Sequence, residues 1–434
     1  MKTLRDTIHG DIELSPLELE VVDTAAFQRL RGIRQLGTTH LVYPGAQHSR
    51  FEHSLGACWL SRRILLQLRK SSGAGLLAGR EEVLHLAALL HDITHVPFGH
   101  TFEDERRLFP RHDESPLRRQ RLVAESAIGT VLRREGVLED VLGVLGGGHG
   151  GGEPARLMRD IVSGTPGADL LDYLRRDAYF CGLKLDYDDR LLQSLSADGD
   201  GVALDIHKSG RLRQDALSEL IHLLRLRYTL TERVYYHHAK VASGAMVSKA
   251  LEGALAEGWL GEEDLLSLRD ESFLALLQTK SRPGGATSRI ASDLLARRLY
   301  KTALELRPAS RWSPGLTALE QERLVLAYHA NTAERARIEA DLAREAGLEP
   351  GEVIVYCPSA GMQLKEADVR VRVPGGTALK LSELELPEVE VLLEQHRRLW
   401  RFSVLVSGRQ RERAGKVAAL AAEKLGLGSG PPPR

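Results

Sequence analysis

The chain has 434 residues, of which 43% are hydrophobic and 27% are charged, values typical of a globular protein of two or three domains. Lys plus Arg and Asp plus Glu both number 59, so no overall basic excess exists for binding nucleic acid. The N-terminal sequence lacks an apolar signal-peptide core, no uncharged run reaches the roughly 18 residues of a membrane span, and the cysteines form no CxxC pair. We therefore expect a cytoplasmic protein with no membrane association.

Helical periodicity dominates the first half of the chain. Apolar residues recur at helical spacing over Ser15–Leu132, and Glu81–His91 is apolar almost all round, which predicts a buried helix. The glycine run Gly146–Gly152 predicts a break, after which helical spacing resumes over Glu153–Phe180. Alternating residues in Gly201–His207, followed by a Lys-Ser-Gly turn, predict a small hairpin.

The second half of the chain is first helical and then mixed. Further helices are predicted at Gln214–Gly258, Glu271–Lys280, Ser288–Leu306 and Ala318–Ala346. The last part alternates strands rich in β-branched residues with helices, and the segments are Glu352–Cys357, Asp368–Val373, Glu388–Leu399, Trp400–Val406 and Gln410–Leu425. The predicted fold class is mainly α, with a helical domain and small hairpin at 1–325, a smaller α/β lobe at 326–425 and a disordered tail at 426–434.

A His-Asp pair at the end of the apolar helix is the most informative local motif. His91 and Asp92 are costly to bury unless something compensates their charge, and a divalent cation would do so, because imidazole and carboxylate are both good ligands. His95 follows His91 by four residues, so the two rings share a face if the helix continues.

Two further segments carry residues of the same kind. Arg50 and His53 are three apart and project from one face of a helix, and Asp169 lies in the first turn of another. Each residue also has an ordinary interpretation: Arg50 as a surface residue, Asp169 as a helix cap, and a single buried His as a hydrogen-bonded core residue. Their concentration beside apolar helices favours a metal site.

Longer strings in these regions resemble a known family. The strings are Asp6–Gly10 (DTIHG), Asp23–Gly37 (DTAAFQRLRGIRQLG), Tyr43–Ala46 (YPGA), Arg50–Gly56 (RFEHSLG), His91–His100, Asp169–Asp177 (DLLDYLRRD) and Arg233–His237 (RVYYH). In them the chain is similar to the HD-domain deoxynucleoside triphosphate triphosphohydrolases, in the branch of the mammalian SAM-and-HD-domain enzyme and its bacterial relatives. The similarity is continuous over residues 4–240 and thinner at Leu295–Lys301.

The resemblance implies a metal-dependent phosphohydrolase. It assigns the metal to His53, His91, Asp92 and Asp169, with Mn, Fe, Ni, Co, Zn or possibly Mg as the ion. The expected reaction converts a dNTP and water into a deoxynucleoside and tripolyphosphate. The nucleotide is the expected partner, and the family implies a homo-oligomer, either a dimer or a tetramer.

The resemblance also implies how the substrate is held. Around the α-phosphate it places Arg50, His95, His100, His112 and Glu103, where the family usually has Asp. We favour His100 over His95 and His112 as the general acid for the nucleoside 5′-oxygen. The substrate-binding set is Gln35, Leu36, Asp172, Tyr173, Asp177, Arg227 and Tyr235. Within it the resemblance assigns the deoxyribose, and discrimination against a 2′-hydroxyl, to Gln35, Leu36, Tyr173 and Asp177.

A second nucleotide site is implied at Asp23, Gln28 and Arg31, where some members of the family bind an activating guanine nucleotide between subunits. Asp23 has an ordinary interpretation as well, because it is a natural N-cap for a helix over Thr24–Gly32. Allosteric activation therefore stays an open alternative at this stage.

Departures from the family pattern leave other functions open. Leu170 stands where close relatives have a phosphate-contacting Lys, and Thr231 falls near the position of a phosphate-contacting His. Fewer cations for the outer phosphates favour a phosphatase acting on monophosphates or other phosphoesters, and a nucleotide-binding regulator is a further alternative. Nucleic-acid binding would rest only on the clusters Arg118–Arg121 and Arg409–Arg413, and such runs usually mark solvated helix faces.

Overall fold

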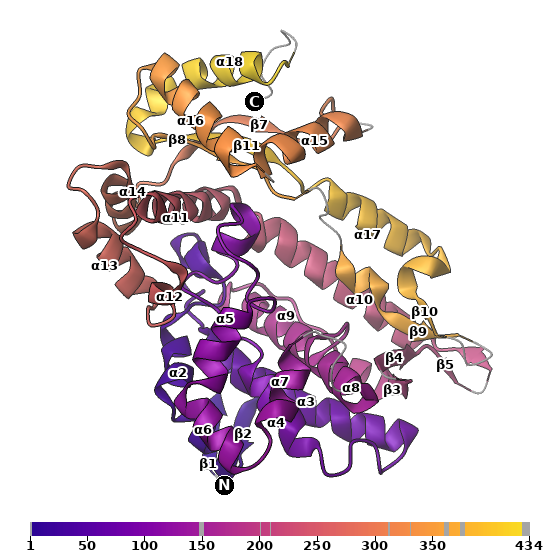
Figure 1. Ribbon diagram of the computed structural model, residues 1–434. Coiled ribbons are helices and arrows are strands. Elements are labelled where there is room, and N and C mark those ends of the chain that lie inside the picture. Colours follow the sequence, from indigo (N-terminus) through magenta and orange to yellow (C-terminus); the bar gives the residue numbers. More distant parts are fainter. Residues whose placement is uncertain are drawn as a thin grey trace.

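The computed structural model describes residues 2–146, 152–199, 201–208, 210–310, 313–329, 331–359, 364–373 and 378–427. Most of the predicted glycine break at Gly146–Gly152 and of the predicted tail at 426–434 lies outside these residues. The described chain is mainly α-helical, which confirms the predicted fold class (Figure 1). None of the described helices is long and apolar enough to cross a membrane.

Three helices form the centre of the N-terminal body. Helix α3 (Arg50–Ser72) packs against both α4 (Glu81–Leu90) and α9 (Ala168–Phe180). The predicted buried helix at Glu81–His91 is confirmed, since nearly all of α4 after its first two residues is buried and His91 forms its C-cap. This packing brings the start of α3, the end of α4 and the start of α9 to one place.

Shorter elements surround these three helices. An N-terminal hairpin that the periodicity did not predict, β1 (Lys2–Asp6) and β2 (Gly10–Leu14), precedes them. The surrounding helices are α1 (Pro16–Val22), α2 (Ala25–Gln28), α5 (Pro116–Arg119), α6 (Ala127–Arg134), α7 (Leu138–Leu145) and α8 (Gly152–Ser163).

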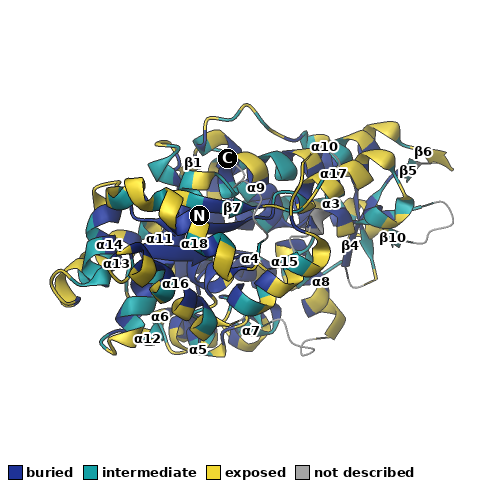
Figure 2. Cartoon of the chain, turned by 90° about the horizontal axis from the view of Figure 1, so that it is seen from above, coloured by how far each residue is buried: buried dark blue, intermediate teal, exposed yellow. Residues whose placement is uncertain are grey.

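The helix predicted over Gln214–Gly258 is two helices. They are α10 (Gln214–Leu230) and α11 (His238–Ala256), separated by a π-helical turn η6 (Thr231–Tyr235). Helix α11 is largely buried in the middle of the molecule (Figure 2). Beside it lie α12 (Glu262–Leu265), α13 (Asp270–Lys280) and α14 (Ala286–Leu295).

The C-terminal lobe is built on a three-stranded antiparallel sheet in the order β7–β11–β8. Its strands are β7 (Lys301–Leu306), β8 (Val353–Tyr356) and β11 (Phe402–Val406), and its helices are α15 (Ala318–Leu324), α16 (Thr332–Ala346) and α18 (Ala414–Lys424). The prediction of a helix over Ser288–Leu306 is therefore wrong beyond Leu295, where the helix ends and β7 follows. In β7 the buried side chains alternate at Leu304 and Leu306, which is the period of a strand and not of a helix.

A second sheet joins distant parts of the sequence, in the order β10–β9–β4–β3. The strands are β3 (Leu195–Asp198), β4 (Gly201–Asp205), β9 (Arg370–Arg372) and β10 (Ala378–Lys380), and β9 runs parallel to β4. Next to them, β5 (His207–Lys208) and β6 (Arg211–Leu212) pair across the turn that the sequence predicted. Helix α17 (Pro387–Arg397) lies along α10 (Figure 1). Strand β7 and the segment from β9 to α17 thus each pack across the boundary predicted at residue 325.

Candidate metal centre and substrate site

The four predicted metal ligands come from three helix ends that the core packing brings together. His53 lies in the first turn of α3, and Asp169 lies in the first turn of α9. His91 and Asp92 follow directly after the last residue of α4. Helix α4 ends at Leu90, so His95 does not share a helical face with His91 as a continuing helix would have placed it.

The ligand atoms converge on a small volume. The Nε2 atoms of His53 and His91 are 3.2 Å apart, and Asp169 Oδ1 lies 3.0 Å from the first and 3.6 Å from the second. Asp92 completes the group, with Oδ2 at 3.6 Å from His53 Nε2 and Oδ1 at 3.6 Å from His91 Nε2. The chain therefore assembles all four predicted ligands in one cluster.

Hydrogen bonds on the far side of each ring fix the orientation of the two imidazoles. His53 Nδ1 lies 2.7 Å from Asp172 Oδ2, and His91 Nδ1 lies 2.7 Å from the carbonyl oxygen of Ala88. Because both partners are acceptors, each Nδ1 can keep its proton while each Nε2 offers a lone pair to a metal ion in the cluster. Two imidazole lone pairs and two carboxylates facing one another fit a divalent cation of the first transition row.

The electrostatics of the cluster agree with that fit. Burial lowers the pKa of His53, but the bonds to Asp169 and Asp172 outweigh it and raise the pKa to about 10. Burial raises the pKa of Asp169, yet His53 and His91 hold it well below its usual value. The carboxylates thus attract positive charge strongly at the point where the ring nitrogens meet.

Asp172 differs from its predicted role. It was expected to contact substrate, but the structure places it behind His53 with no exposed side-chain surface. Its Oδ1 accepts from His9 and Arg176, and its Oδ2 accepts from His53 and Arg176, while Arg176 in turn bonds Asp6. Asp172 is therefore placed to support His53, one of the predicted metal ligands, and its side chain is closed to the surface. His9 was not singled out, because Asp172 is distant from it in sequence, and Arg176 was not, although it lies one helical turn after Asp172.

A second cluster holds the three predicted phosphate-site histidines. The rings of His95 and His112 stack at 3.6 Å between centroids, and His100 packs edge-on against both. Glu103, on the π-helical turn η3 (Thr101–Glu105), lies 3.3 Å from His100 Nδ1 and 3.5 Å from His112 Nδ1. His100 is the most open of the three, with 41% of its side chain exposed.

Asp92 links the two clusters. Its Oδ1 lies 3.2 Å from His95 Nε2, and its Oδ2 accepts a hydrogen bond from Arg50. Burial lowers the pKa of both His95 and His112, and the Arg50 charge lowers that of His95 further. These two rings are therefore neutral at pH 7, whereas Arg50 supplies a fixed positive charge beside the metal ligands.

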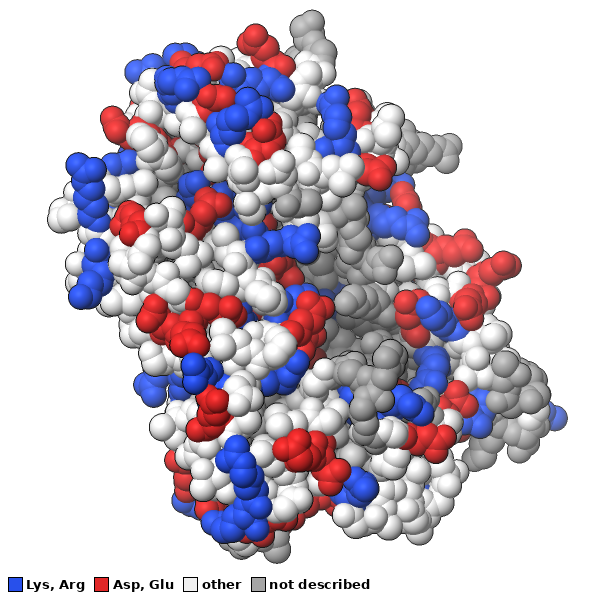
Figure 3. Space-filling model, in the orientation of Figure 1, with Lys and Arg blue, Asp and Glu red and all other residues white. Residues whose placement is uncertain are grey.

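A buried arginine that the sequence did not indicate also belongs to this cluster. Arg118 belongs to a run predicted to be solvated, but its side chain is fully buried. It donates to Glu103 at 2.6 Å and to Glu262 at 2.8 Å. Among the other arginines of such runs, Arg409 pairs with Asp293, and the face in Figure 3 shows basic and acidic side chains interspersed. These arrangements give no support to the nucleic-acid interpretation.

The predicted sugar-binding residues also lie together. Asp177 receives hydrogen bonds from His48 at 2.8 Å and from the Tyr235 hydroxyl at 2.7 Å. The Arg227 guanidinium lies over the rings of Tyr173 and Tyr235, at 5.3 and 5.0 Å. Two more predicted residues join this group from the other side: the Gln35 N–H donates to the His48 carbonyl, and Leu36 packs against the adjoining core.

The three predicted effector residues lie on a surface segment. Asp23 is exposed and is the C-cap of α1, whereas Thr24 caps α2, so the expected N-cap role of Asp23 is wrong. Arg31 donates to the Gln28 side chain at 2.8 Å and stacks on Phe51 at 3.5 Å. The segment is therefore ordered by contacts within the chain.

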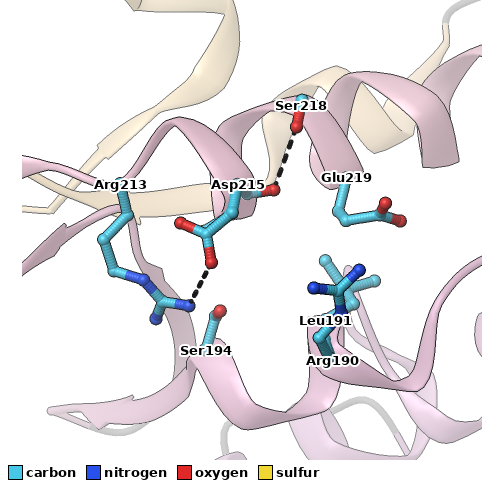
Figure 4. Close-up of a pocket in the computed structure, with 8 residues that line it drawn as sticks. Arg190, Leu191, Ser194, Arg213, Asp215, Ser218 and Glu219 are labelled. Carbon is cyan, nitrogen blue, oxygen red and sulfur yellow. Dashed lines mark hydrogen bonds and ion pairs between the residues drawn. The ribbon is translucent and has the colours of Figure 1, made fainter.

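Two cavities within the described residues lie away from these clusters. One, of about 90 Å³, lies between η5 (Asp189–Ser194) and the start of α10 (Figure 4). Its charges are balanced, because Arg190 and Arg213 face Asp215 and Glu219. The other, of about 230 Å³, is lined by residues of α11, α14 and α16. Neither contains a residue of the metal or histidine clusters.

Comparison with known proteins places these clusters in context. The family model of the HD domain matches residues 50–175, which hold the four metal ligands, and that of the HD associated region matches residues 188–429. An uncharacterized protein of Methanocaldococcus jannaschii is 30% identical over 324 residues, 72% of this chain and 62% of its own length.

Two further similarities extend over most of the described fold. A protein named deoxynucleoside triphosphate triphosphohydrolase SAMHD1 homolog, from Dictyostelium discoideum, is 28% identical over 338 residues, 72% of this chain and 62% of its own length. The crystal structure of a hypothetical protein from Aquifex aeolicus superimposes with a TM-score of 0.69 at 26% identity, covering 96% of this chain and 99% of that one. The chain spans about three fifths of the length of the two curated relatives.

Proposed function

The chain belongs to the HD-domain family of phosphohydrolases, and from this we propose that it hydrolyses dNTPs to a deoxynucleoside and tripolyphosphate. One observation carries the proposal: Asp92 joins the four-ligand cluster to Arg50 and the three-histidine cluster. A metal site and a phosphate site then share one carboxylate. The relative from Dictyostelium, whose name states this activity, supports the choice of substrate.

The residues of the two clusters have distinct roles in the proposed reaction. His53, His91, Asp92 and Asp169 would hold the metal, which polarises a phosphoryl oxygen and lowers the pKa of bound water. Arg50 neutralises charge on the α-phosphate as water attacks phosphorus and the bond to the 5′-oxygen breaks. His100 donates a proton to that oxygen, and Glu103 orients the ring through Nδ1.

The sugar is proposed to lie against the Asp177 group. Asp177 is held in place by His48 and Tyr235, so it presents a fixed carboxylate beside the aromatic rings of Tyr173 and Tyr235. Gln35 reaches the same place through the His48 main chain, and its buried Oε1 has no hydrogen-bond partner. We propose that this fixed arrangement distinguishes deoxynucleotides from ribonucleotides.

A second candidate function is hydrolysis of monophosphates or other phosphoesters at the same centre. It is favoured by Leu170, which is buried in the core, and by Thr231, whose buried hydroxyl donates to the main-chain carbonyl of Arg227 in α10. Neither position supplies a cation for a β- or γ-phosphate. A regulatory role as a nucleotide sensor is the third candidate, and retention of both clusters argues for the enzyme.

The test is an assay of products. Purified protein with Mn²⁺ is incubated with each dNTP, alone and with GTP, and the products are separated by ion exchange. Deoxynucleoside with tripolyphosphate, absent in a variant carrying His91→Ala and Asp92→Ala, is the expected result. A requirement for GTP, with assembly into a dimer or tetramer, would extend the proposal to the Asp23, Gln28 and Arg31 segment. Orthophosphate as the product would move the assignment to the second candidate.

A further inference from the structure

The segment Ile93–His100, here named the catalytic loop, carries two of the phosphate-site histidines without regular secondary structure. It forms successive turns after the end of α4. Phe98 has a φ of 61° and Gly99 a φ of 58°, the left-handed region that non-glycine residues adopt at a cost. A loop of this shape requires outside contacts that determine it, because its own backbone favours other conformations.

A buried arginine holds the first half of the catalytic loop. Arg29, at the start of η1 (Arg29–Gly32), is only 4% exposed. Its Nη2 donates to the carbonyl oxygens of Ile93 at 3.0 Å and of His95 at 2.8 Å. Its Nη1 donates to the carbonyl oxygen of Leu268 at 3.5 Å, just before helix α13. One guanidinium thus ties the backbone of a phosphate-site histidine to a segment far along the chain.

A buried aspartate holds the second half. Asp270, the first residue of α13, has no exposed surface. Its Oδ1 accepts from the N–H of Phe98 at 2.8 Å, and its Oδ2 accepts from the N–H of Arg34 at 3.0 Å. The first bond fixes the residue with the left-handed conformation. The second fixes the residue that precedes Gln35, so one carboxylate sets the catalytic loop against the proposed sugar site.

These contacts use buried charge mainly to hold main-chain geometry. A buried ion is costly unless it is fully bonded, and an apolar side chain would fill the same space without that cost. The described hydrogen bonds of Arg29 and Asp270 go to backbone atoms, apart from a contact of Asp270 with Arg34 at 3.4 Å. None reaches the side chain of a metal ligand or a phosphate-site histidine.

We propose that Arg29 and Asp270 are positioning residues that hold the catalytic loop in the shape required for phosphoester hydrolysis. The inference rests on the proposed function and deepens it, since it names two residues that act through His95 and His100 and not on the substrate. A displacement of about 1 Å at reacting groups lowers turnover by about 100-fold, so release of the loop should reduce kcat more than KM.

The experiment compares Arg29→Met, Arg29→Lys and Asp270→Asn with the wild type. Hydrolysis of dGTP is measured with Mn²⁺, and hydrogen exchange of residues 93–100 is followed by mass spectrometry on the Mn²⁺-loaded protein. We expect Arg29→Met to lower kcat by about 100-fold with KM within about three-fold. Hydrogen exchange of the loop should become faster in Arg29→Met. Arg29→Lys should recover part of the kcat and part of the protection from exchange, because an ammonium still donates to a carbonyl. The milder Asp270→Asn should give the same pattern to a smaller extent.

The control is Arg159→Met, which removes another arginine that donates to two main-chain carbonyls, those of Val144 and Gly143. It should change neither kcat nor exchange of the loop. The proposal would be overturned if Arg29→Met and Asp270→Asn kept the kcat of the wild type and its rate of hydrogen exchange in the loop. It would also be overturned if exchange became faster evenly over the whole chain. If the wild type hydrolyses no dNTP, the proposed function fails separately. Hydrogen exchange of the loop still tests the positioning role in that case. Faster exchange confined to the loop in the two variants supports the role, and unchanged exchange rejects it.

Discussion

Asp172 is a buried carboxylate that supports the predicted metal ligand His53 from behind. Its carboxylate accepts from His53 on one side and from Arg176 and His9 on the other, all without exposure to solvent. Burial raises its pKa, but Arg176 and the histidine bonds hold it well below the usual value, so it stays ionised. An ionised acceptor behind His53 increases the basicity of the ring nitrogen that faces the metal.

Replacing this acceptor should weaken metal binding. In Asp172→Asn, we expect the affinity for Mn²⁺ to fall by about 10- to 100-fold, because a neutral amide orients His53 less well and adds a donor facing Arg176. Isothermal titration of the metal-free protein with Mn²⁺ measures the change. Asp189→Asn, which alters an aspartate paired with Arg63 and Arg175 nearer the surface, is the control. An unchanged Mn²⁺ affinity in Asp172→Asn would reject the supporting role.

Among the elements, the pair α3 and α9 sets the spacing of the ligands. Gly56 lies one turn after His53 on α3, and a Cβ built there would come within 1.9 Å of Asp172 Oδ1 and 2.6 Å of the Arg176 guanidinium. The two helices therefore approach as closely as they do because this position has no side chain. The same approach brings His53 and Asp169 to 3.0 Å.

A single methyl group should separate the two helices. We expect Gly56→Ala to lower the free energy of unfolding by about 1–3 kcal/mol through overpacking, and to weaken Mn²⁺ binding as well. Gly143→Ala is the matched control, because that glycine lies in α7 with open space around it. There the same substitution should stabilise the protein by about 0.5–1 kcal/mol, since alanine favours a helix. Denaturant unfolding followed by circular dichroism measures both changes in the free energy of unfolding. If both substitutions stabilised the protein, or both destabilised it, close packing at Gly56 would not explain the result.

At the scale of the whole molecule, a buried ion network joins the C-terminal lobe to the catalytic elements. Arg106 directly follows the turn η3 that carries Glu103, and it pairs with Glu252 on α11 and Glu339 on α16. Lys249 bonds the same two carboxylates, and Arg335 donates to the Arg106 carbonyl. The lobe is thereby fixed to the segment that orients the phosphate-site histidines.

Removal of the charge on Glu339 should release part of this contact. We expect Glu339→Gln to lower the free energy of unfolding by about 3 kcal/mol at pH 7, because it leaves buried cations without a full partner. Thermal unfolding measures the loss, with the exposed Glu388→Gln as the control. A Tm equal to that of the wild type would show that the network does not stabilise the lobe.

The pH dependence of stability gives a second readout of the same contact. Burial raises the pKa of Glu339, but Arg106 and Lys249 outweigh it and lower the pKa from 4.5 to about 2. A lowered folded-state pKa means that the ionised group stabilises the protein above pH 4.5 and that this contribution is lost as the pH falls toward about 2. Glu339→Gln should therefore lose less stability over this range than the wild type does.

The sequence predicted features that depend on local spacing and missed those that depend on distant partners. The helices around the site follow from apolar periodicity, and the four metal ligands follow from the HD resemblance. The burial of Arg118 could not be predicted, because its partner Glu103 precedes it in the sequence and its partner Glu262 follows much later. The inward position of Asp172 likewise depends on His9, which is distant in sequence, and on Arg176, whose other partner Asp6 is distant as well.

The strand β7 illustrates the same limit for elements. Its sequence continues the apolar spacing of α14, and only pairing with β11, almost a hundred residues later, determines that it is extended. The pairing of β9 with β4 is a further case, with Val371 opposite Leu204. Such contacts are specified by the assembled core and not by any window of the sequence.

Strand β9 follows lobe strand β8 in the sequence and pairs with β4, so the position at which the protein is truncated affects the N-terminal body. Shortening the chain before β9 would leave β4 with a neighbour on one side only, where Ala203 and Leu204 are now fully buried. An uncovered apolar edge of this kind recruits strands from other molecules. A fragment that keeps both site clusters but stops at the lobe would therefore self-associate into aggregates, so the two halves of the sequence must be expressed as one piece.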